Sequence, residues 1–340
     1  MIDTSTIKKL DLQLSDIVIE ILTTLHKNNH EAYIVGGFIR NFFLKTNIVT
    51  DYDLATSATP DEIIDLFKEY VVDTRGIKYG VIQLKRNDEI IDIATFRKEE
   101  YCDNSRYNVN ITFTKSVQED SLRRDFTINA IYYSPYHKIK DFYNGLDDLN
   151  HKLIKTIKDP YISFKEDPLR IIRALKLKLQ YDLIIDHFTL LAMQHLKHLI
   201  SNLSKNVVTN NFISCLKSSK SIDDLTITFD IFSSLFILHE QHVIDDIIKI
   251  IASSKLNNDN SNYVILIAHL ANKSFDQTKF LNFFSFSKID KEDIKMIIEN
   301  HQIDLADSKN KDMFLRKYPE IRSFNQITLY QSLFNKDIHK

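Results

Sequence analysis

Glycine is rare in this 340-residue chain and is confined to one part of it. All five glycines precede residue 146: Gly36, Gly37, Gly76, Gly80 and Gly145. Nine of the eleven arginines, against 33 lysines, also lie at or before Arg173. Glycine is needed where the backbone turns unusually or approaches another group closely, and arginine where a planar, bidentate donor is needed. We therefore expect the first 175 or so residues to carry the chemistry, although a purely helical second half would also need few glycines.

Alternating strand and helix signals fill the first 150 residues, and helical periodicity dominates after residue 160. Helices are expected over residues 5–28, 38–44 and 60–70, and again from about residue 117 through the run 123–130. Strands are expected over residues 32–35, 81–85, 89–95, 131–133 and 139–142, with another carrying Asp51 and Asp53. The polar stretch from Arg97 to Thr112 is expected to be an irregular, mobile loop.

Bulk composition restricts the class of protein. The formal net charge of −2 predicts that any nucleic-acid surface is a local patch. Lys205, Lys217 and Lys220 are candidate phosphate contacts, although solvated lysines are the simpler interpretation. Two distant cysteines, a polar N-terminus and the lack of a long apolar run predict a soluble cytoplasmic protein with no membrane association. No protein partner is indicated.

Asp51 and Asp53 are two residues apart, so on a strand their carboxylates point to the same face. Asp92, between two isoleucines in a later strand, is a third candidate. Carboxylates held together repel one another unless a cation lies between them. Three facing one cleft can hold two Mg²⁺ ions, the arrangement used for phosphoryl and nucleotidyl transfer.

Gly36 and Gly37 stand between a predicted strand and a helix, where free backbone N–H groups can face an anion. Arg40, one turn later, could pair with the same anion. A tight strand-to-helix turn would explain the glycine pair alone.

Two further segments carry candidate ligands. Arg124 and Asp125 belong to a charged run that packing does not require, and Asn129 could bond a ribose or a base. Asp167 precedes a proline and could simply cap a helix. With Arg170 and Arg173 it could also offer an acceptor and donors on one helix face.

These segments together resemble the class II tRNA nucleotidyltransferase and bacterial poly(A) polymerase family, a branch of the polymerase-β-like superfamily. The motifs occur in the family's order: Gly36-Gly37-Phe-Ile-Arg40, Asp51-Tyr-Asp53, Arg123-Arg124-Asp125-Phe-Thr-Ile-Asn129, Asp141 to Asp148, and Glu166-Asp167-x-x-Arg170. The resemblance implies an α+β fold. A nucleotidyltransferase head with a small mixed sheet (residues 1–150) would precede an all-helical neck (151–220) and a helical body and tail (221–340).

The resemblance also implies roles for individual residues. Asp51, Asp53 and Asp92 would bind the catalytic Mg²⁺ ions, and Gly36, Gly37 and Arg40 would hold the triphosphate. Arg124, Asp125 and Asn129 would contact the nucleotide's sugar and support the base pocket. Asp167 and Arg170, with Arg173 beyond them, would read the base edge of CTP or ATP in place of a template.

Some positions depart from the family pattern. Asn41 stands where an aspartate is usual, and Asn206, Val207 and Asn211 replace charged residues of a later helix. The segment after Arg97, with Tyr101 and Asp103, has the length typical of enzymes that complete CCA. We therefore expect CCA addition to the tRNA 3′ end from CTP and ATP with release of pyrophosphate. The alternatives are poly(A) addition, addition of CC or A alone, and an inactive RNA-binding homologue.

Overall fold

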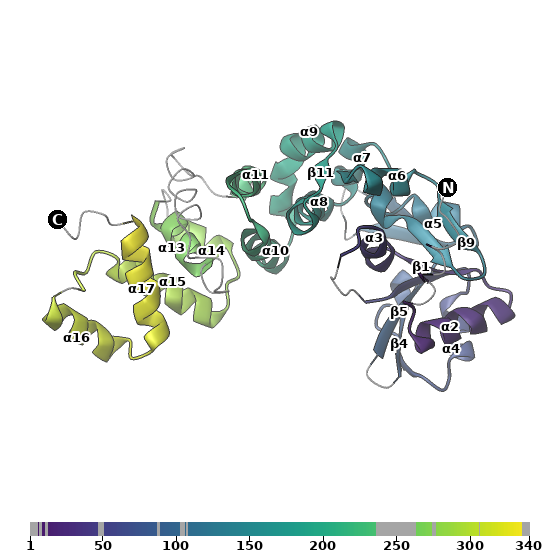
Figure 1. The fold of residues 1–340 in the computed structure, drawn as a ribbon, viewed down its shortest axis with the longest axis horizontal. Coiled ribbons are helices and arrows are strands. Elements are labelled where there is room, and N and C mark those ends of the chain that lie inside the picture. Colours follow the sequence, from purple (N-terminus) through teal and green to yellow (C-terminus); the bar gives the residue numbers. More distant parts are fainter. Residues whose placement is uncertain are drawn as a thin grey trace. The chain divides into compact units, whose positions relative to one another are not determined.

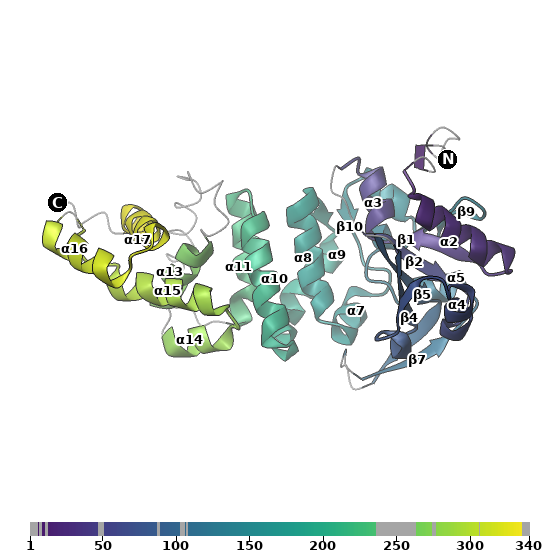
Figure 2. The ribbon, with the colours of Figure 1, turned by 90° about the horizontal axis from the view of Figure 1, so that it is seen from below.

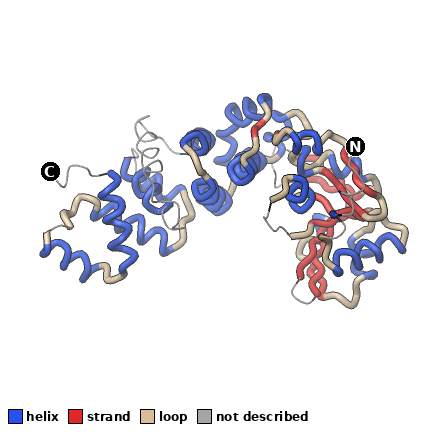
Figure 3. Tube along the Cα trace, in the orientation of Figure 1, coloured by secondary structure: helices blue, strands red, loops and turns tan. Residues whose placement is uncertain are grey.

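A computed structural model describes residues 6, 9–10, 13–46, 51–86, 89–102, 106, 108–235, 263–273, 277–305 and 307–334. The chain divides into two compact units. The first is Met1–Arg170 with Asp182–Ala192, and the second is Ile171–Tyr181 with Met193–Lys340. The seven-stranded sheet belongs to the first unit, and the second is built from helices (Figure 3).

The first unit is organised around a seven-stranded mixed sheet in the order β3-β4-β5-β2-β1-β8-β9 (Figure 1). Its strands are β1 (Ala32–Val35), β2 (Asp53–Thr56), β3 (Val71–Asp73), β4 (Val81–Arg86), β5 (Glu89–Thr95), β8 (Ile131–Ser134) and β9 (Lys138–Asp141). β2 and β5 are parallel, and the other neighbours are antiparallel. Both faces of β1 are buried, which explains its continuous apolar sequence.

The helices of this unit begin at recognisable sequence signals. α2 (Asp16–Lys27) begins after Ser15, whose hydroxyl accepts from the Val18 N–H, and it buries Ile17, Ile21 and other apolar residues. α4 (Pro60–Leu66) begins with the expected Thr59 cap, completed as a capping box by Glu62. The remaining helices are α3 (Gly37–Phe43), α5 (Val117–Ser121), α6 (Gly145–Asn150) and α7 (Pro160–Glu166), with the 3₁₀ turns η1 (Ile77–Tyr79) and η2 (Thr127–Asn129).

Four local expectations were wrong. The helix expected over residues 5–28 is interrupted, because α2 begins only after Ser15. The stretch predicted as a mobile loop after Arg97 contains an antiparallel pair, β6 (Arg97–Tyr101) and β7 (Val109–Phe113), because alternation with charged residues hid the strand period. Residues 103–105 and 107, which include Asp103, lie outside the described residues. The helix expected to carry the run 123–130 ends at Ser121. Asp51 precedes β2, whose first residue is Asp53.

The division between the two units falls within α8 and within α9 along the chain. α8 (Leu169–Tyr181) and α9 (His187–Leu196) flank β11 (Ile184–Ile185), which pairs in parallel with β10 (Leu153–Ile154). This short pair departs from the purely helical prediction for residues after 160.

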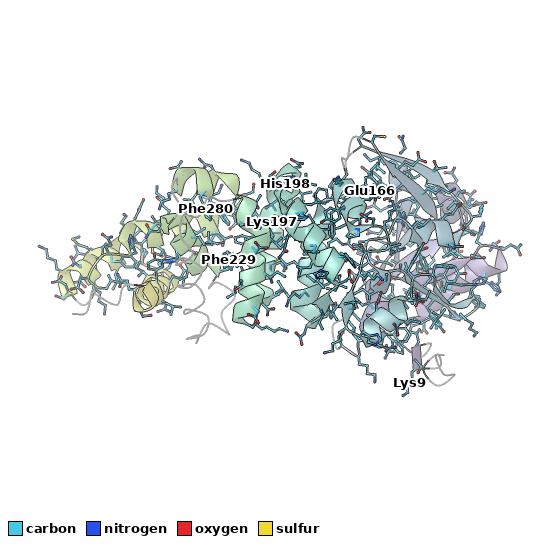
Figure 4. The ribbon with its side chains drawn as sticks, turned by 90° about the horizontal axis from the view of Figure 1, so that it is seen from above. Lys9, Glu166, Lys197, His198, Phe229 and Phe280 are labelled. Atoms are coloured by element: carbon cyan, nitrogen blue, oxygen red, sulfur yellow. The ribbon has the colours of Figure 1, made fainter. Side chains whose placement is uncertain are left out.

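The second unit holds α10 (Lys205–Ser218), α11 (Ile222–Phe232), α13 (Tyr263–Lys273), α14 (Gln277–Phe283), α15 (Lys288–Asn300), α16 (Ser308–Lys317) and α17 (Ile321–Phe334), with η3 (Lys197–Asn202) and η4 (Ser233–Leu235). The C-terminal part of α8 lies beside α10 and α11 (Figure 2). Two hydrogen bonds join them: the Lys176 ammonium donates to the Asn211 side chain, and the Lys178 ammonium donates to the Asp224 carboxylate. Phe229 and Phe280, labelled in Figure 4, belong to its aromatic core.

The predicted fold class is confirmed: a mixed-sheet head with helices precedes a helical region. The boundaries proposed at residues 150 and 220 stay predictions.

Candidate active site

Two of the predicted carboxylates lie side by side in the sheet. Asp53 at the start of β2 pairs with Asp92 in β5, so both side chains project from the same face. The row continues across β1 and β8, because Val35 pairs with Asp53 on one side and with Tyr132 on the other. Asp53 is exposed and Asp92 is half-buried, so this pair can be reached by a ligand.

Gln83 and Asp51 complete the surroundings of the pair. Gln83, the partner of Asp92 in β4, donates from Nε2 to Asp92 Oδ1 at 2.8 Å. Asp51 is exposed and lies two residues before Asp53. Within the part of the chain that the structure describes, no three His, Cys, Asp or Glu side chains converge closely enough to hold a metal ion. The three-carboxylate set therefore stays a prediction.

Gly36 lies directly against the Asp53 carboxylate. Its φ is +80°, and a Cβ added to it would lie 3.3 Å from Asp53 Oδ2. A side chain here would be strained and would also crowd the carboxylate. Gly37 is the first residue of α3. Glycine at position 36 therefore leaves room for the Asp53 carboxylate. A tight strand-to-helix turn, the alternative explanation for the glycine pair, would not need that room.

Arg40, Asn129 and Asp125 form one buried network. Arg40 Nη1 donates to Asn129 Oδ1 at 2.7 Å, and Asn129 Nδ2 donates to Asp125 Oδ1 at 3.1 Å. Asn41 Oδ1 accepts from both Nε and Nη2 of Arg40 at 3.2 and 3.0 Å. Asn41, where the family pattern has an aspartate, therefore still holds Arg40, by a hydrogen bond without a full charge.

The motif from Asp141 to Asp148 packs against the turn that carries Asn129. The Asp141 carboxylate accepts from the backbone N–H groups of Gly145 and Leu146 at 2.8 and 2.9 Å, which caps α6. Thr127, in the same turn as Asn129, donates to Asp148 at 2.6 Å. A Cβ on Gly145 would lie 2.3 Å from the Thr127 carbonyl oxygen, so α6 packs against this turn only because residue 145 is glycine.

Arg124 follows α5 in the chain and is held by Tyr132. Its Nε donates to the Tyr132 hydroxyl at 2.7 Å, and its guanidinium carbon lies 5.0 Å from the centre of that ring. Burial opposes its charge, but Tyr132, Asp120 and Asp53 outweigh that effect and raise the pKa of Arg124. The hydroxyl that holds this guanidinium belongs to Tyr132, which lies in the same cross-strand row as Asp53.

Asp120 and Glu99 are residues that sequence reasoning missed. Asp120 is fully buried and accepts from Arg123 Nε at 2.8 Å. Burial alone would raise the pKa of Asp120, but Arg123 and Arg124 lower it below its usual range. Glu99 pairs with Arg97 at 2.7 Å and approaches Arg123 to 3.6 Å. The spacing of Asp120 from Arg123 and Arg124, three and four residues, was the available signal.

Arg170 is enclosed by the first unit. Its Nη1 donates to Ser163 Oγ at 2.9 Å and pairs with Glu166, labelled in Figure 4, at 3.2 Å. Its Nη2 donates to the Arg123 carbonyl oxygen at 3.0 Å and to the Tyr101 hydroxyl at 3.3 Å. The side chain is only 4% exposed, so the site holds Arg170 in one orientation.

Asp167 is not on one helix face with Arg170, because it lies between α7 and α8. Its Oδ1 accepts from the Leu169 N–H at 3.0 Å, as the capping interpretation predicts. The same oxygen lies 3.4 Å from Arg106 Nη1. Arg173 follows one turn along α8, in the second unit.

Two of the lysines considered for RNA contacts interact with other residues of the second unit. Lys205 donates to the Asn282 carbonyl oxygen at 2.9 Å, and the Lys217 ammonium lies 4.5 Å from the centre of the Tyr263 ring. Their internal contacts favour the structural interpretation for these two lysines.

Residues 32–155 match the family described as the poly A polymerase head domain. This part of the chain is therefore similar to that head domain. Over 190 residues, the chain is 40% identical to a CCA-adding enzyme of Oceanobacillus iheyensis, covering 56% of this chain and 46% of that protein. It is 35% identical over 196 residues to a CCA-adding enzyme of Enterococcus faecalis, covering 58% and 48%. The chain thus spans about half the length of the curated relatives it matches.

Solved structures share the fold over nearly the whole chain. A Bacillus stearothermophilus CCA-adding enzyme in complex with CTP superposes with a TM-score of 0.72 at 20% identity, covering 93% of this chain and 77% of that one. A Thermotoga maritima CCA-adding enzyme complexed with tRNA-CCA gives 0.73 at 16% identity, covering 96% and 83%. The likeness therefore extends to the helical region beyond the head domain. Among the described residues, no helix combines the length and apolar character needed to cross a membrane.

Proposed function

We propose that this protein is a template-independent nucleotidyltransferase that adds CCA to the 3′ end of tRNA from CTP and ATP. The observation that carries the proposal is the Asp53–Asp92 pair, accessible in the sheet and bordered by a glycine without which Asp53 would be crowded. The similarity of the first half of the chain to CCA-adding enzymes selects this reaction among nucleotidyl transfers. Such an enzyme would act in the cytoplasm, where tRNA is processed.

The donors present at the site fit Mg²⁺, which prefers hard oxygen ligands such as the carboxylates of Asp51, Asp53 and Asp92. When bound there, Mg²⁺ would stabilise charge on the attacking and leaving oxygens of an in-line displacement. The RNA 3′-hydroxyl would attack the α-phosphate of CTP or ATP, and pyrophosphate would leave.

The remaining residues bind and orient the nucleotide. The turn at Gly36 and Gly37 and the buried Arg40 guanidinium receive the triphosphate, and Asn129 and Asp125 lie next to Arg40 to meet the sugar. Arg124, bonded to the Tyr132 hydroxyl on the sheet face that carries Asp53, contributes positive charge. Positioning and fixed charge of this kind supply most of the acceleration in phosphoryl transfer.

Asp167 and Arg170, with Arg173 beyond them, recognise the base edge of CTP or ATP. In this structure, the Asp167 carboxylate lies 3.4 Å from the Arg106 guanidinium. Both terminal nitrogens of Arg170 donate hydrogen bonds to protein groups. Base recognition therefore exchanges some of these internal bonds for bonds to the base. The cost of that exchange lets a correct base be distinguished from one that leaves the donors unpaired.

The test is incorporation by the purified protein with Mg²⁺ on tRNA transcripts ending before CCA, after C and after CC. CTP and ATP are supplied singly and together. Addition that stops after one complete CCA is the expected result. Addition of CC or A alone would mean a split activity, and long A tails on any RNA would mean a poly(A) polymerase. If no acceptor is extended, the protein is an RNA-binding homologue or acts on another substrate.

Asp53→Asn is the first variant to compare. Losing a carboxylate that would hold Mg²⁺ removes the stabilisation of transition-state charge that the ion would supply, several kcal/mol, so the rate should fall roughly a thousandfold or more. Asp65→Asn is the matched control, because Asp65 is an exposed carboxylate of α4 that forms a surface ion pair with Lys68 at 3.1 Å. Equal activity of both variants would remove Asp53 from the mechanism.

A further inference from the structure

Asp120 occupies a place in the head that the proposed chemistry does not use. It lies within α5 and is completely enclosed. Four donors surround its carboxylate: the Arg97 N–H at 3.2 Å, Arg123 Nε at 2.8 Å, Arg124 Nη2 at 3.4 Å and the Tyr132 hydroxyl at 2.7 Å. Oδ1 receives the first two and Oδ2 the last two.

Such a carboxylate is costly to bury unless its partners satisfy it fully. Here each oxygen has one guanidinium partner and one neutral donor, so both oxygens are used. Asp120 holds Arg123 directly, because a charge-assisted hydrogen bond of 2.8 Å is directional and strong. Its own contact with Arg124 is longer, at 3.4 Å, so Asp120 acts on Arg124 chiefly through the Tyr132 hydroxyl, which bonds both.

Tyr132 extends this control toward the carboxylate pair. It donates to Asp120 and accepts from Arg124 Nε, so it joins the two. In the sheet, Tyr132 pairs with Val35, and Val35 pairs with Asp53. Tyr132 and Asp53 are thus two strands apart in one row, about 10 Å at the usual strand spacing. The Arg124 guanidinium, bonded to the Tyr132 hydroxyl, therefore lies on the same face of the sheet as Asp53.

We propose that Asp120, together with Tyr132, positions the Arg124 guanidinium on the face of the sheet that carries Asp53, for the incoming nucleotide. The inference rests on the proposed function, since Arg124 is there a nucleotide contact. Asp120 itself touches no substrate and is a positioning residue. Its loss should change nucleotide affinity and turnover through Arg124 and not merely the stability of the fold.

Tyr132→Phe is the decisive variant, because it removes the hydroxyl that joins Asp120 to Arg124 and leaves the ring. Tyr33→Phe is its matched control. Tyr33 is equally buried, packs edge-to-face on Tyr132 at 5.9 Å and also donates to a carboxylate, that of Glu31 at 2.8 Å. Both variants should lower the melting temperature to a similar extent.

The kinetics should separate them. With Tyr132→Phe, kcat/KM for CTP and for ATP should fall about tenfold, as expected for loss of one charge-assisted hydrogen bond, whereas Tyr33→Phe should stay near wild type. Asp120→Asn, if folded, should lose more than Tyr132→Phe. In a double-mutant cycle, Tyr132→Phe should add almost nothing to Arg124→Lys, since both act on the same guanidinium.

Equal kinetics for the two tyrosine variants, or independent effects in the cycle, would overturn the inference. Equilibrium binding of CTP and ATP in the presence of Mg²⁺ separates it from the proposed function. A wild-type protein that binds both nucleotides, weakened by Tyr132→Phe, but extends no tRNA would refute CCA addition and leave the positioning role standing. A wild-type protein that binds neither nucleotide would refute both.

Discussion

Gly36 shows how one residue can set the chemistry of a site by having no side chain. It stands between β1 and α3 with a φ of +80°, and its missing Cβ leaves space at Asp53 Oδ2. Gly36→Ala should destabilise the fold by about 1–3 kcal/mol, because its φ of 80° and ψ of −131° lie in a backbone region that residues with a side chain rarely adopt. Displacing the Asp53 carboxylate should reduce kcat/KM by up to about a hundredfold.

The activity loss can be distinguished from the strain. Asn29, at the opposite end of β1, has a similar φ of +62°. Asn29→Ala should therefore lower the free energy of unfolding, because alanine tolerates this region less well than asparagine, and should leave nucleotide incorporation unchanged. Urea unfolding and incorporation rates measured on both variants make the comparison. If both lose activity in proportion to stability, the space at Asp53 is unimportant.

At the scale of elements, the β6–β7 pair packs closely against Gly80, the residue before β4. Its φ is +70°, and a Cβ there would lie 2.5 Å from the Phe113 ring at the end of β7. Gly80→Ala should cost about 2–4 kcal/mol in unfolding free energy, through strain and overpacking. Adding Phe113→Ala should recover about 1 kcal/mol of that loss, because the overlap disappears but the strain persists.

Gly76 provides the comparison for this prediction. A Cβ on Gly76 would meet the Val81 carbonyl oxygen at 2.9 Å, away from Phe113. Phe113→Ala should therefore give no recovery when combined with Gly76→Ala. The same recovery in both backgrounds would mean that Phe113 does not hold β7 at Gly80. Urea unfolding curves of Gly80→Ala and Gly76→Ala, each with and without Phe113→Ala, distinguish these outcomes.

At the scale of the whole molecule, buried acids and arginines link folding to pH. Burial opposes the charge of Asp120 and Glu99, but the neighbouring arginines lower the pKa of both carboxyl groups. A lowered folded-state pKa stabilises the protein above the unfolded-state value, about 4, and this stability is lost as pH falls through the folded-state pKa. Unfolding free energy should therefore fall steeply below about pH 4.

Variants identify the source of this acid sensitivity. Asp120→Asn should reduce stability at pH 7 and flatten its dependence on pH below 4, since the amide cannot be protonated in that range. Asp65→Asn, at an exposed ion pair, should leave the slope unchanged. Urea midpoints at pH 7, 5, 4 and 3 test this. An unchanged slope with Asp120→Asn would assign the acid sensitivity to other carboxyl groups.

The sequence alone determined those features that depend on neighbours along the chain. The apolar run at residues 32–35 and the following glycines predicted β1 and the turn into α3, and Thr59-Pro60 predicted the start of α4. Alternation placed β4 and β5 correctly. Local patterns succeed here because strand period, caps and positive-φ turns are set within a few residues.

Only the tertiary structure decided which of these residues meet. Tyr101 and Arg170 are 69 positions apart, and Arg40 and Asn129 are 89 apart, so no local pattern could join them. The β6–β7 strands form in a polar segment because they pair with each other, and Asp120 matters because folding removes it from water together with two arginines. Burial and long-range pairing are properties of the packed chain, and they decide which charges become part of the site.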